Sequence, residues 1–356
     1  MPHHTKNAIR YNNKTMKNKQ LAIILCLSVF FQLTSCKNHI KELNQNAFKQ
    51  TAKVIGYLPS GRFNQGSKIE YCKLTHLNLA FANPDASGNL IMAPITNIVT
   101  QAKTANPNIK ICISLAGGGN FSPERTKNWS NLIDIASKRP AFITKIVDYV
   151  LANNIDGVDV DLEWDHVTIG YSGFITELKT ALDAHNKIIT AALPNNTRFE
   201  NITNEALQAF DFINIMSYDA TGPWRPEKPG QHSSFQSSKA GIDFWKHTVK
   251  IPKDKLTLGV PFYGYNFGNN PVTSITYRQL VDSDVALADT DQSNSTYYNG
   301  IPTIEAKVEL AKKEVGGIMI WELGQDSFDS YSLLSTIHNK YTALQVKTSG
   351  LCGNEP

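Results

Sequence analysis

Residues 155–164 read IDGVDVDLEW, and the rest of the chain is organised around this stretch. The residues between its acids are apolar and mostly β-branched, which favours a buried strand over a helical turn. Alternate residues of a strand share one face, so Asp159, Asp161 and Glu163 are expected in one row. The stretch therefore predicts a strand that carries three neighbouring carboxyls.

Such a row is costly, because an unpaired buried charge loses several kcal/mol of solvation or takes up a proton instead. Neighbouring acids cannot all ionise, so at least one pKa in the row should be raised. A raised carboxyl pKa suits a general acid that works near neutral pH. The alternative is a strand end whose acids meet Lys, Arg or water.

Strand and helix patterns alternate along the chain on both sides of this stretch. Eight apolar segments are predicted as strands, at 54–58, 76–82, 109–115, 155–163, 188–193, 210–218, 256–263 and 317–321. Helical patterns occupy 96–105, 141–153, 171–185, 241–249, 303–313 and 329–341. The alternation predicts a single α/β domain of the (β/α)₈ or TIM-barrel type. A doubly wound open sheet is the alternative, but the first strand is not followed by G-x-G-x-x-G.

In such a barrel the chemistry lies at the C-terminal ends of the strands. Aromatic and acidic residues gather there, and flat rings with nearby polar groups suit a sugar ring. The residues expected at these ends are Tyr57, Phe81, Glu163, Tyr218, Asp219, Tyr263 and Trp321.

The domain boundaries follow from the parts that lack these patterns. We expect the catalytic domain at 52–343 and a loose C-terminal tail at 344–356. Residues 268–315 read as a short rim excursion between strands 7 and 8, with no large insertion domain.

The N-terminal residues indicate export. The hydrophobic run 21–33 is shorter than the roughly 20 residues that span a bilayer, and basic residues precede it. Residues 33–36 (LTSC) resemble the lipobox of bacterial lipoproteins, which implies a lipoprotein signal peptide at 1–35 and a lipid anchor on Cys36. We expect a polar tether at 36–51 and a membrane-anchored protein of the cell envelope or surface. A plain signal peptide with an incidental cysteine is the alternative.

Charge and cysteine content limit the partners. Five of the basic residues behind the net charge of +4 precede the hydrophobic run, so nucleic acid is not expected as a partner. Metal-ligand spacings are absent from the sequence, and neither a metal nor a cofactor is predicted. Cys72, Cys112 and Cys352 remain after export, and their pairing stays open. A monomer is expected.

Taken together, these motifs resemble family-18 glycoside hydrolases, the chitinase family. The family signature D-x-x-D-x-D-x-E is present as Asp156, Asp159, Asp161 and Glu163. The S-x-G-G motif is approximated at residues 114–117, with alanine at the first glycine, and M-x-Y-D stands at residues 216–219. Trp321 matches the tryptophan that ends the eighth strand.

The resemblance implies a retaining, substrate-assisted mechanism. In it Glu163 protonates the glycosidic oxygen, Asp161 holds the acetamido N–H, Asp159 tunes Asp161, and Tyr218 donates to the acetamido oxygen. The remaining substrate contacts are expected from Tyr57, Phe81, Trp164, Met216, Asp219, Trp224, Tyr263 and Trp321.

Three functions fit this resemblance. The first is a chitinase-type hydrolase of β-1,4-linked N-acetylglucosamine polymers or oligomers. The second is an endo-β-N-acetylglucosaminidase that acts on N-glycan cores, and the third is an inactive chitin- or glycan-binding protein. The complete carboxyl row speaks against the third function, and the aromatic residues at the rim favour the first over the second.

Overall fold

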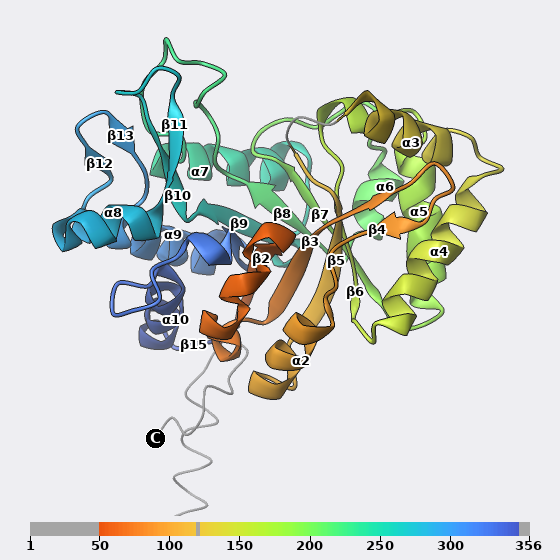
Figure 1. Ribbon diagram of the computed structural model, residues 1–356, viewed down its shortest axis with the longest axis horizontal. Coiled ribbons are helices and arrows are strands. Elements are labelled where there is room, and N and C mark those ends of the chain that lie inside the picture. Colours follow the sequence, from red (N-terminus) through yellow and green to blue (C-terminus); the bar gives the residue numbers. More distant parts are fainter. Residues whose placement is uncertain (1–49, 119–121, 349–356) are drawn as a thin grey trace, which may run out of the picture. The chain divides into compact units, whose positions relative to one another are not determined.

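A closed barrel of eight parallel strands forms the centre of the computed structural model, which describes residues 50–118 and 122–348 (Figure 1). The strand β2 pairs with both β14 and β3, so the sheet closes on itself, and β4 (Leu90–Ile91) adds an antiparallel edge to β3. The predicted (β/α)₈ barrel is confirmed. The barrel strands are β2 (Lys53–Pro59), β3 (His76–Pro84), β5 (Lys110–Ala116), β6 (Gly157–Asp161), β7 (Ile188–Pro194), β8 (Phe212–Met216), β9 (Leu256–Pro261) and β14 (Gly317–Trp321).

Helices surround the barrel and cover the apolar outer faces of its strands (Figure 1). Val158 and Val160 on β6 are fully buried in this outer core, which is why the strand reads as apolar between its acids. The helices are α2 (Thr96–Ala105), α3 (Pro123–Ile133), α4 (Arg139–Ala152), α5 (Tyr171–Asp183), α6 (Asn204–Ala209), α7 (Phe235–Asp243), α9 (Ile301–Glu314) and α10 (Leu333–Ala343).

The chain between β9 and α9 forms the predicted rim excursion as a small folded unit. It contains a four-stranded antiparallel sheet in the order β11-β10-β13-β12. Its strands are β10 (Tyr263–Asn266), β11 (Thr273–Thr276), β12 (Gln292–Ser293) and β13 (Thr296–Tyr297), joined through helix α8 (Tyr277–Ser283). Strands of two to four residues are too short to show a hydrophobic period. The sequence therefore predicts the excursion but not the sheet within it.

The two ends of the described chain pair with each other, which differs from the expected tether and loose tail. The strand β1 (Gln50–Thr51) lies parallel to β15 (Val346–Lys347), and Val346 is buried. Both lie at the N-terminal ends of the barrel strands. The strand β1 leads directly into β2, whose first residue, Lys53, donates its N–H to Gly316 O just before β14, at 2.9 Å. Strands this short carry no apolar repeat, so their pairing is set by the barrel that aligns them. Cys36, Cys352 and the rest of the signal and tail lie outside the described residues.

The cysteines and the helices of the described chain can be compared with the expectations. Cys72 is disulfide-bonded, whereas Cys112 is a buried free thiol. In the ranges that the structure describes, no helix has the length and hydrophobicity needed to cross a membrane.

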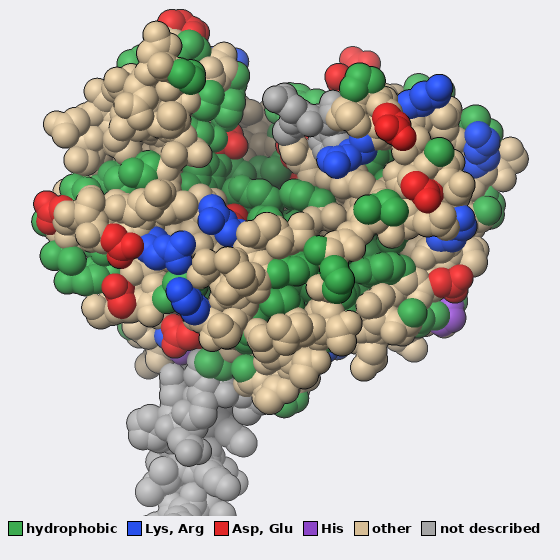
Figure 2. Space-filling model, in the orientation of Figure 1, with side chains coloured by type: hydrophobic (Ala, Val, Ile, Leu, Met, Phe, Trp, Pro, Cys, Tyr) green, Lys and Arg blue, Asp and Glu red, His purple; other side chains and the backbone are tan. Residues whose placement is uncertain are grey.

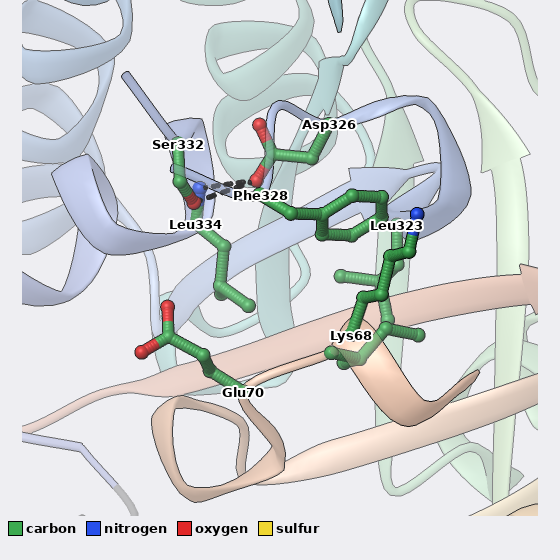
Figure 3. Close-up of a pocket in the computed structure, with 8 residues that line it drawn as sticks. Lys68, Glu70, Leu323, Asp326, Phe328, Ser332 and Leu334 are labelled. Carbon is green, nitrogen blue, oxygen red and sulfur yellow. Dashed lines mark hydrogen bonds between the residues drawn. The ribbon is translucent and has the colours of Figure 1, made fainter. Parts of the chain in front are cut away.

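Helix α10 begins at a buried carboxyl beside a small pocket (Figure 3). Asp326 accepts hydrogen bonds from Ser332 Oγ at 2.9 Å and from the backbone N–H groups of Leu333 and Leu334. Burial raises the pKa of Asp326 to about 7 against these donors. The pocket measures about 40 Å³, which has room for about one or two water molecules and none for a sugar.

Candidate active site

A groove of about 940 Å³ opens at the C-terminal ends of the barrel strands. Figure 2 shows the hollow between the β10–β13 side and the α3 side, with hydrophobic side chains along its floor. The lining residues are Phe81, Gly118, Asp161, Glu163, Trp164, Pro194, Asn195, Asn196, Thr197, Met216, Tyr218, Asp219, Ala220, Trp224, Arg225, Ser237 and Trp321. Asp161 and Glu163 thus face the same groove as Tyr218, as the strand alternation predicts.

The first acid of the signature lies away from the groove. Asp156 precedes β6 and pairs with Lys103 Nζ at 2.6 Å and Lys110 Nζ at 3.2 Å. Its carboxyl also accepts from Ile111 N at 2.9 Å. Although burial opposes ionisation, these donors hold the pKa of Asp156 below its usual value. This acid therefore fastens β6 to β5 and takes no part in the groove.

The second acid is fully buried beneath the groove and surrounded by donors. Asp159 Oδ2 accepts from Tyr57 Oη and Ser114 Oγ, each at 2.7 Å. Its Oδ1 accepts from Thr190 Oγ1 at 2.6 Å and from Asn214 Nδ2 at 3.4 Å. Burial raises the pKa of Asp159, and the four donors oppose that rise by stabilising the charged form. The donors fix the carboxyl in place below Asp161.

The third and fourth acids, Asp161 and Glu163, both have raised pKa values. Asp161 Oδ1 is buried without a hydrogen-bond partner in the described structure. Burial, with Glu163 and Asp159 adding like charge, raises the pKa of Asp161 well above its usual value. Burial and the charge of Asp219 raise the pKa of Glu163 to about 7. A proton held in this pair near neutral pH is what a general acid requires, and the direction of both pKa shifts agrees with the sequence prediction.

Tyrosines and a histidine orient Asp219. Its Oδ1 accepts from Tyr263 Oη at 2.5 Å and Tyr265 Oη at 3.0 Å, and His232 Nδ1 lies 3.4 Å away. With these contacts on Oδ1, the second carboxyl oxygen is available to the groove. Burial, followed by the charge of Asp161, raises the pKa of Tyr218 well above 10, so its hydroxyl remains a donor.

Aromatic rings form the floor and one end of the groove. Trp321 stacks on Phe81 with centroids 5.6 Å apart and 23° between the planes. Trp164 and Trp224 are 63% and 54% exposed, which is unusual for such large rings. Each is supported at its edge by another ring, Phe199 for Trp164 and Tyr265 for Trp224. A ring that is fixed by a neighbour at its edge and exposed on its face is suited to stacking on a sugar.

Two glycines after β5 make room, one for the acid Glu163 and the other for the ring of Phe81. A Cβ at Gly118 would lie 2.3 Å from Glu163 Oε1, and one at Gly117 would lie 2.5 Å from the Phe81 ring. Gly117 also has φ +89°, a conformation that favours glycine. Ala116, which replaces the first glycine of the motif, has φ +71° without a glycine's freedom.

The structure brings most of the predicted site residues together. Asp161, Glu163 and Tyr218 line the groove with Phe81, Trp164, Met216, Asp219, Trp224 and Trp321. Two residues differ from their predicted position, because Tyr57 and Tyr263 are buried beneath the lining and donate to Asp159 and Asp219. In the described ranges, no cluster of three or more His, Cys, Asp or Glu is placed to hold a metal ion.

Sequence reasoning missed several groove residues. Asn195, Asn196 and Thr197 follow directly after β7, so the strand-end rule could have found them. Arg225 of the groove lining comes from the long segment between β8 and α7, where no sequence pattern marks which side chains turn inward. The same segment supplies His232, which is buried outside the lining and contacts Asp219.

A closed parallel barrel whose rim combines buried carboxyls with exposed aromatic rings is the arrangement that a glycoside hydrolase needs. The family model for glycosyl hydrolases family 18 matches residues 53–326. The crystal structure of the family-18 chitinase ChiB from the chitin utilization locus of Flavobacterium johnsoniae is 56% identical, with a TM-score of 0.84. That match covers 86% of this chain and 99% of the other.

Two further relatives agree with this assignment. A chitinase from Bacteroides thetaiotaomicron is 30% identical with a TM-score of 0.72, over 82% of this chain and 96% of its own. Chitinase A1 from Niallia circulans is 26% identical over 72% of this chain, which spans about half, 48%, of that relative. The chain belongs to family 18 of the glycosyl hydrolases. The prediction of a family-18, chitinase-type glycosidase is thereby confirmed.

Proposed function

We propose that this chain hydrolyses β-1,4 bonds between N-acetylglucosamine units in chitin-type polymers or oligomers. The observation that carries the proposal is the pair Asp161 and Glu163 in the groove, with the pKa of Glu163 raised to about 7 by burial and by Asp219. The relatives described above as chitinases support the substrate class. The groove also lies near the upper end of the usual size range of ligand pockets, about 300–1,000 Å³, and suits an extended chain of sugars.

The proposed reaction begins with a sugar seated over Trp321. Glu163 donates its proton to the glycosidic oxygen, and the bond from that oxygen to the anomeric carbon breaks. The substrate's own acetamido oxygen attacks the anomeric carbon and closes an oxazolinium ring. Water then opens this ring while Glu163 takes back a proton, so the configuration at the anomeric carbon is retained.

The other acids would serve the acetamido group. Asp161, which lines the groove, would accept the acetamido N–H and stabilise the positive ring. Tyr218 would donate its hydroxyl to the acetamido oxygen and align it for attack. Asp159 lies behind Asp161 and tunes its charge, while Tyr57 and Ser114 hold Asp159 in place.

A single substitution tests this function. Glu163→Gln should abolish turnover of chitooligosaccharides while keeping their affinity, because the amide fills the same space without an acidic proton. Turnover is measured by separation of the products, and affinity by calorimetry with the same oligomers. Glu200→Gln, at an exposed carboxyl outside the groove lining, is the matched control. Hydrolysis that survives in Glu163→Gln would contradict the assigned role.

The same assay separates the rival functions. Purified wild-type protein is offered chitooligosaccharides in one reaction and a high-mannose glycoprotein in another. Cleavage of the glycoprotein alone would identify an endo-β-N-acetylglucosaminidase. Binding without turnover of either substrate would identify a glycan-binding protein.

Export, the lipid anchor on Cys36 and the monomeric state are further parts of the proposal. The hydrophobic run 21–33 and the LTSC sequence at 33–36 support the anchor. In this proposal the enzyme acts on glycans from the membrane surface of the cell envelope.

A further inference from the structure

One cationic side chain faces the groove among the described residues that line it. Arg225 shares this lining with the carboxyls of Asp161, Glu163 and Asp219. Its side chain is exposed, and within the described ranges no hydrogen bond or ion pair engages its guanidinium. An unpaired cation in the same groove as three acids is available to interact with the substrate.

The backbone that carries this arginine is held in a closed turn. Arg225 N donates to Gly222 O at 2.8 Å, and Lys228 N donates to Arg225 O at 2.9 Å. Thr221 Oγ1 closes the turn by donating to Lys228 O at 2.6 Å. The turn fixes the backbone position of Arg225, while its guanidinium has no partner within the described ranges.

The strand order places Arg225 on the opposite side of the groove from the stacked rings of Phe81 and Trp321. Phe81 and Trp321 come from β3 and β14, which flank β2 in the closed barrel. The loops that carry Trp164, Asn195 and Arg225 follow β6, β7 and β8, which are consecutive on the opposite side. Glu163, the proposed proton donor to the leaving oxygen, follows β6 on that same side. With the reacting sugar over Trp321, the sugars of the leaving group therefore lie past Glu163, toward Arg225.

We propose that Arg225 makes the leaving-group half of the groove select acetylated sugars over deacetylated ones. This inference rests on the function proposed above and names the substrate class more narrowly. The carboxyls would attract the ammonium group of a glucosamine residue, and the guanidinium repels it. An N-acetylated sugar is neutral and meets no such repulsion. Bonds followed by an acetylated sugar are therefore cut in preference to bonds followed by a glucosamine.

The test is a competition within one substrate. Partially acetylated chitosan is digested by the full chain at mildly acidic pH, where the sugar amine is protonated. Sequencing the product ends gives the ratio of cuts before glucosamine to cuts before N-acetylglucosamine. Arg225→Gln should raise this ratio about threefold, the effect of two unit charges about 7 Å apart in water, and Arg225→Glu should raise it further. Arg225→Lys keeps the charge and should keep the ratio.

Two controls separate charge from shape. Lys228→Gln removes a cation from the same turn but from outside the groove lining, and should leave the ratio unchanged. At about 1 M salt, where the screening length is about 3 Å, the shift in Arg225→Gln should disappear. An unchanged ratio in Arg225→Gln and Arg225→Glu, or a shift that persists at high salt, overturns the inference. Wild-type protein that fails to cut fully acetylated oligomers overturns the proposed function instead.

Discussion

Glu163→Gln should stabilise the fold at alkaline pH, although the same change should abolish turnover. In the folded protein burial and Asp219 raise the pKa of Glu163 from 4.5 to about 7. The protonated form is thus favoured by folding, and its contribution to stability is present below about pH 4.5 and lost as the pH rises through 7. Glutamine imitates the protonated acid at every pH. At about 1.4 kcal/mol for each pH unit, the variant should gain about 3 kcal/mol over wild type.

The measurement is the free energy of unfolding in urea, followed by tryptophan fluorescence, for both proteins at about pH 4.5 and about pH 8.5. The difference between them should grow by about 3 kcal/mol over this interval. Glu200→Gln, which removes an exposed carboxyl, corrects for the loss of one negative charge. A difference that is the same at both pH values would mean that Glu163 ionises as it does in water, and the case for an acid with a raised pKa would fail.

Three further predictions concern the pH profile, the acetamido group and the anchor. Asp219→Asn should move the alkaline limb of kcat/KM to lower pH, because the charge of Asp219 raises the pKa of Glu163; an unmoved limb in the pH–rate profile counts against this coupling. Tyr218→Phe should lower kcat by about ten- to a hundredfold, the value of one charge-assisted hydrogen bond, and steady-state kinetics showing no change would remove its assigned role. Cys36→Ala should release the protein from the membrane fraction and end incorporation of labelled fatty acid; a variant that still carries the label is not anchored through that cysteine.

The barrel and its acids could be read from the sequence because both depend on local pattern. Strands buried on both faces appear as apolar runs, and the acids of β6 interrupt such a run at alternate positions. The placement of Glu163 and Asp161 in one groove followed from that alternation alone.

The remaining features depend on contacts between distant segments. Tyr57 and Tyr263 stand near the ends of their predicted strands, as Phe81 and Trp321 do, yet they are buried as donors to Asp159 and Asp219. Their side chains point to acids that lie 102 and 44 residues away in the chain. No local pattern distinguishes a ring that faces the groove from one that supports a carboxyl. The β10–β13 sheet was missed for a related reason, because its short strands are specified by pairing and not by periodicity.

The pairing of β1 with β15 has a practical consequence. Both ends of the described chain meet at the bottom of the barrel, opposite the mouth through which a polymer would enter. A resin, bead or surface attached upstream of Gln50 or downstream of Thr348 therefore joins the domain at the end of the barrel opposite the groove. Immobilised in either way, the enzyme would present an unobstructed face to insoluble material.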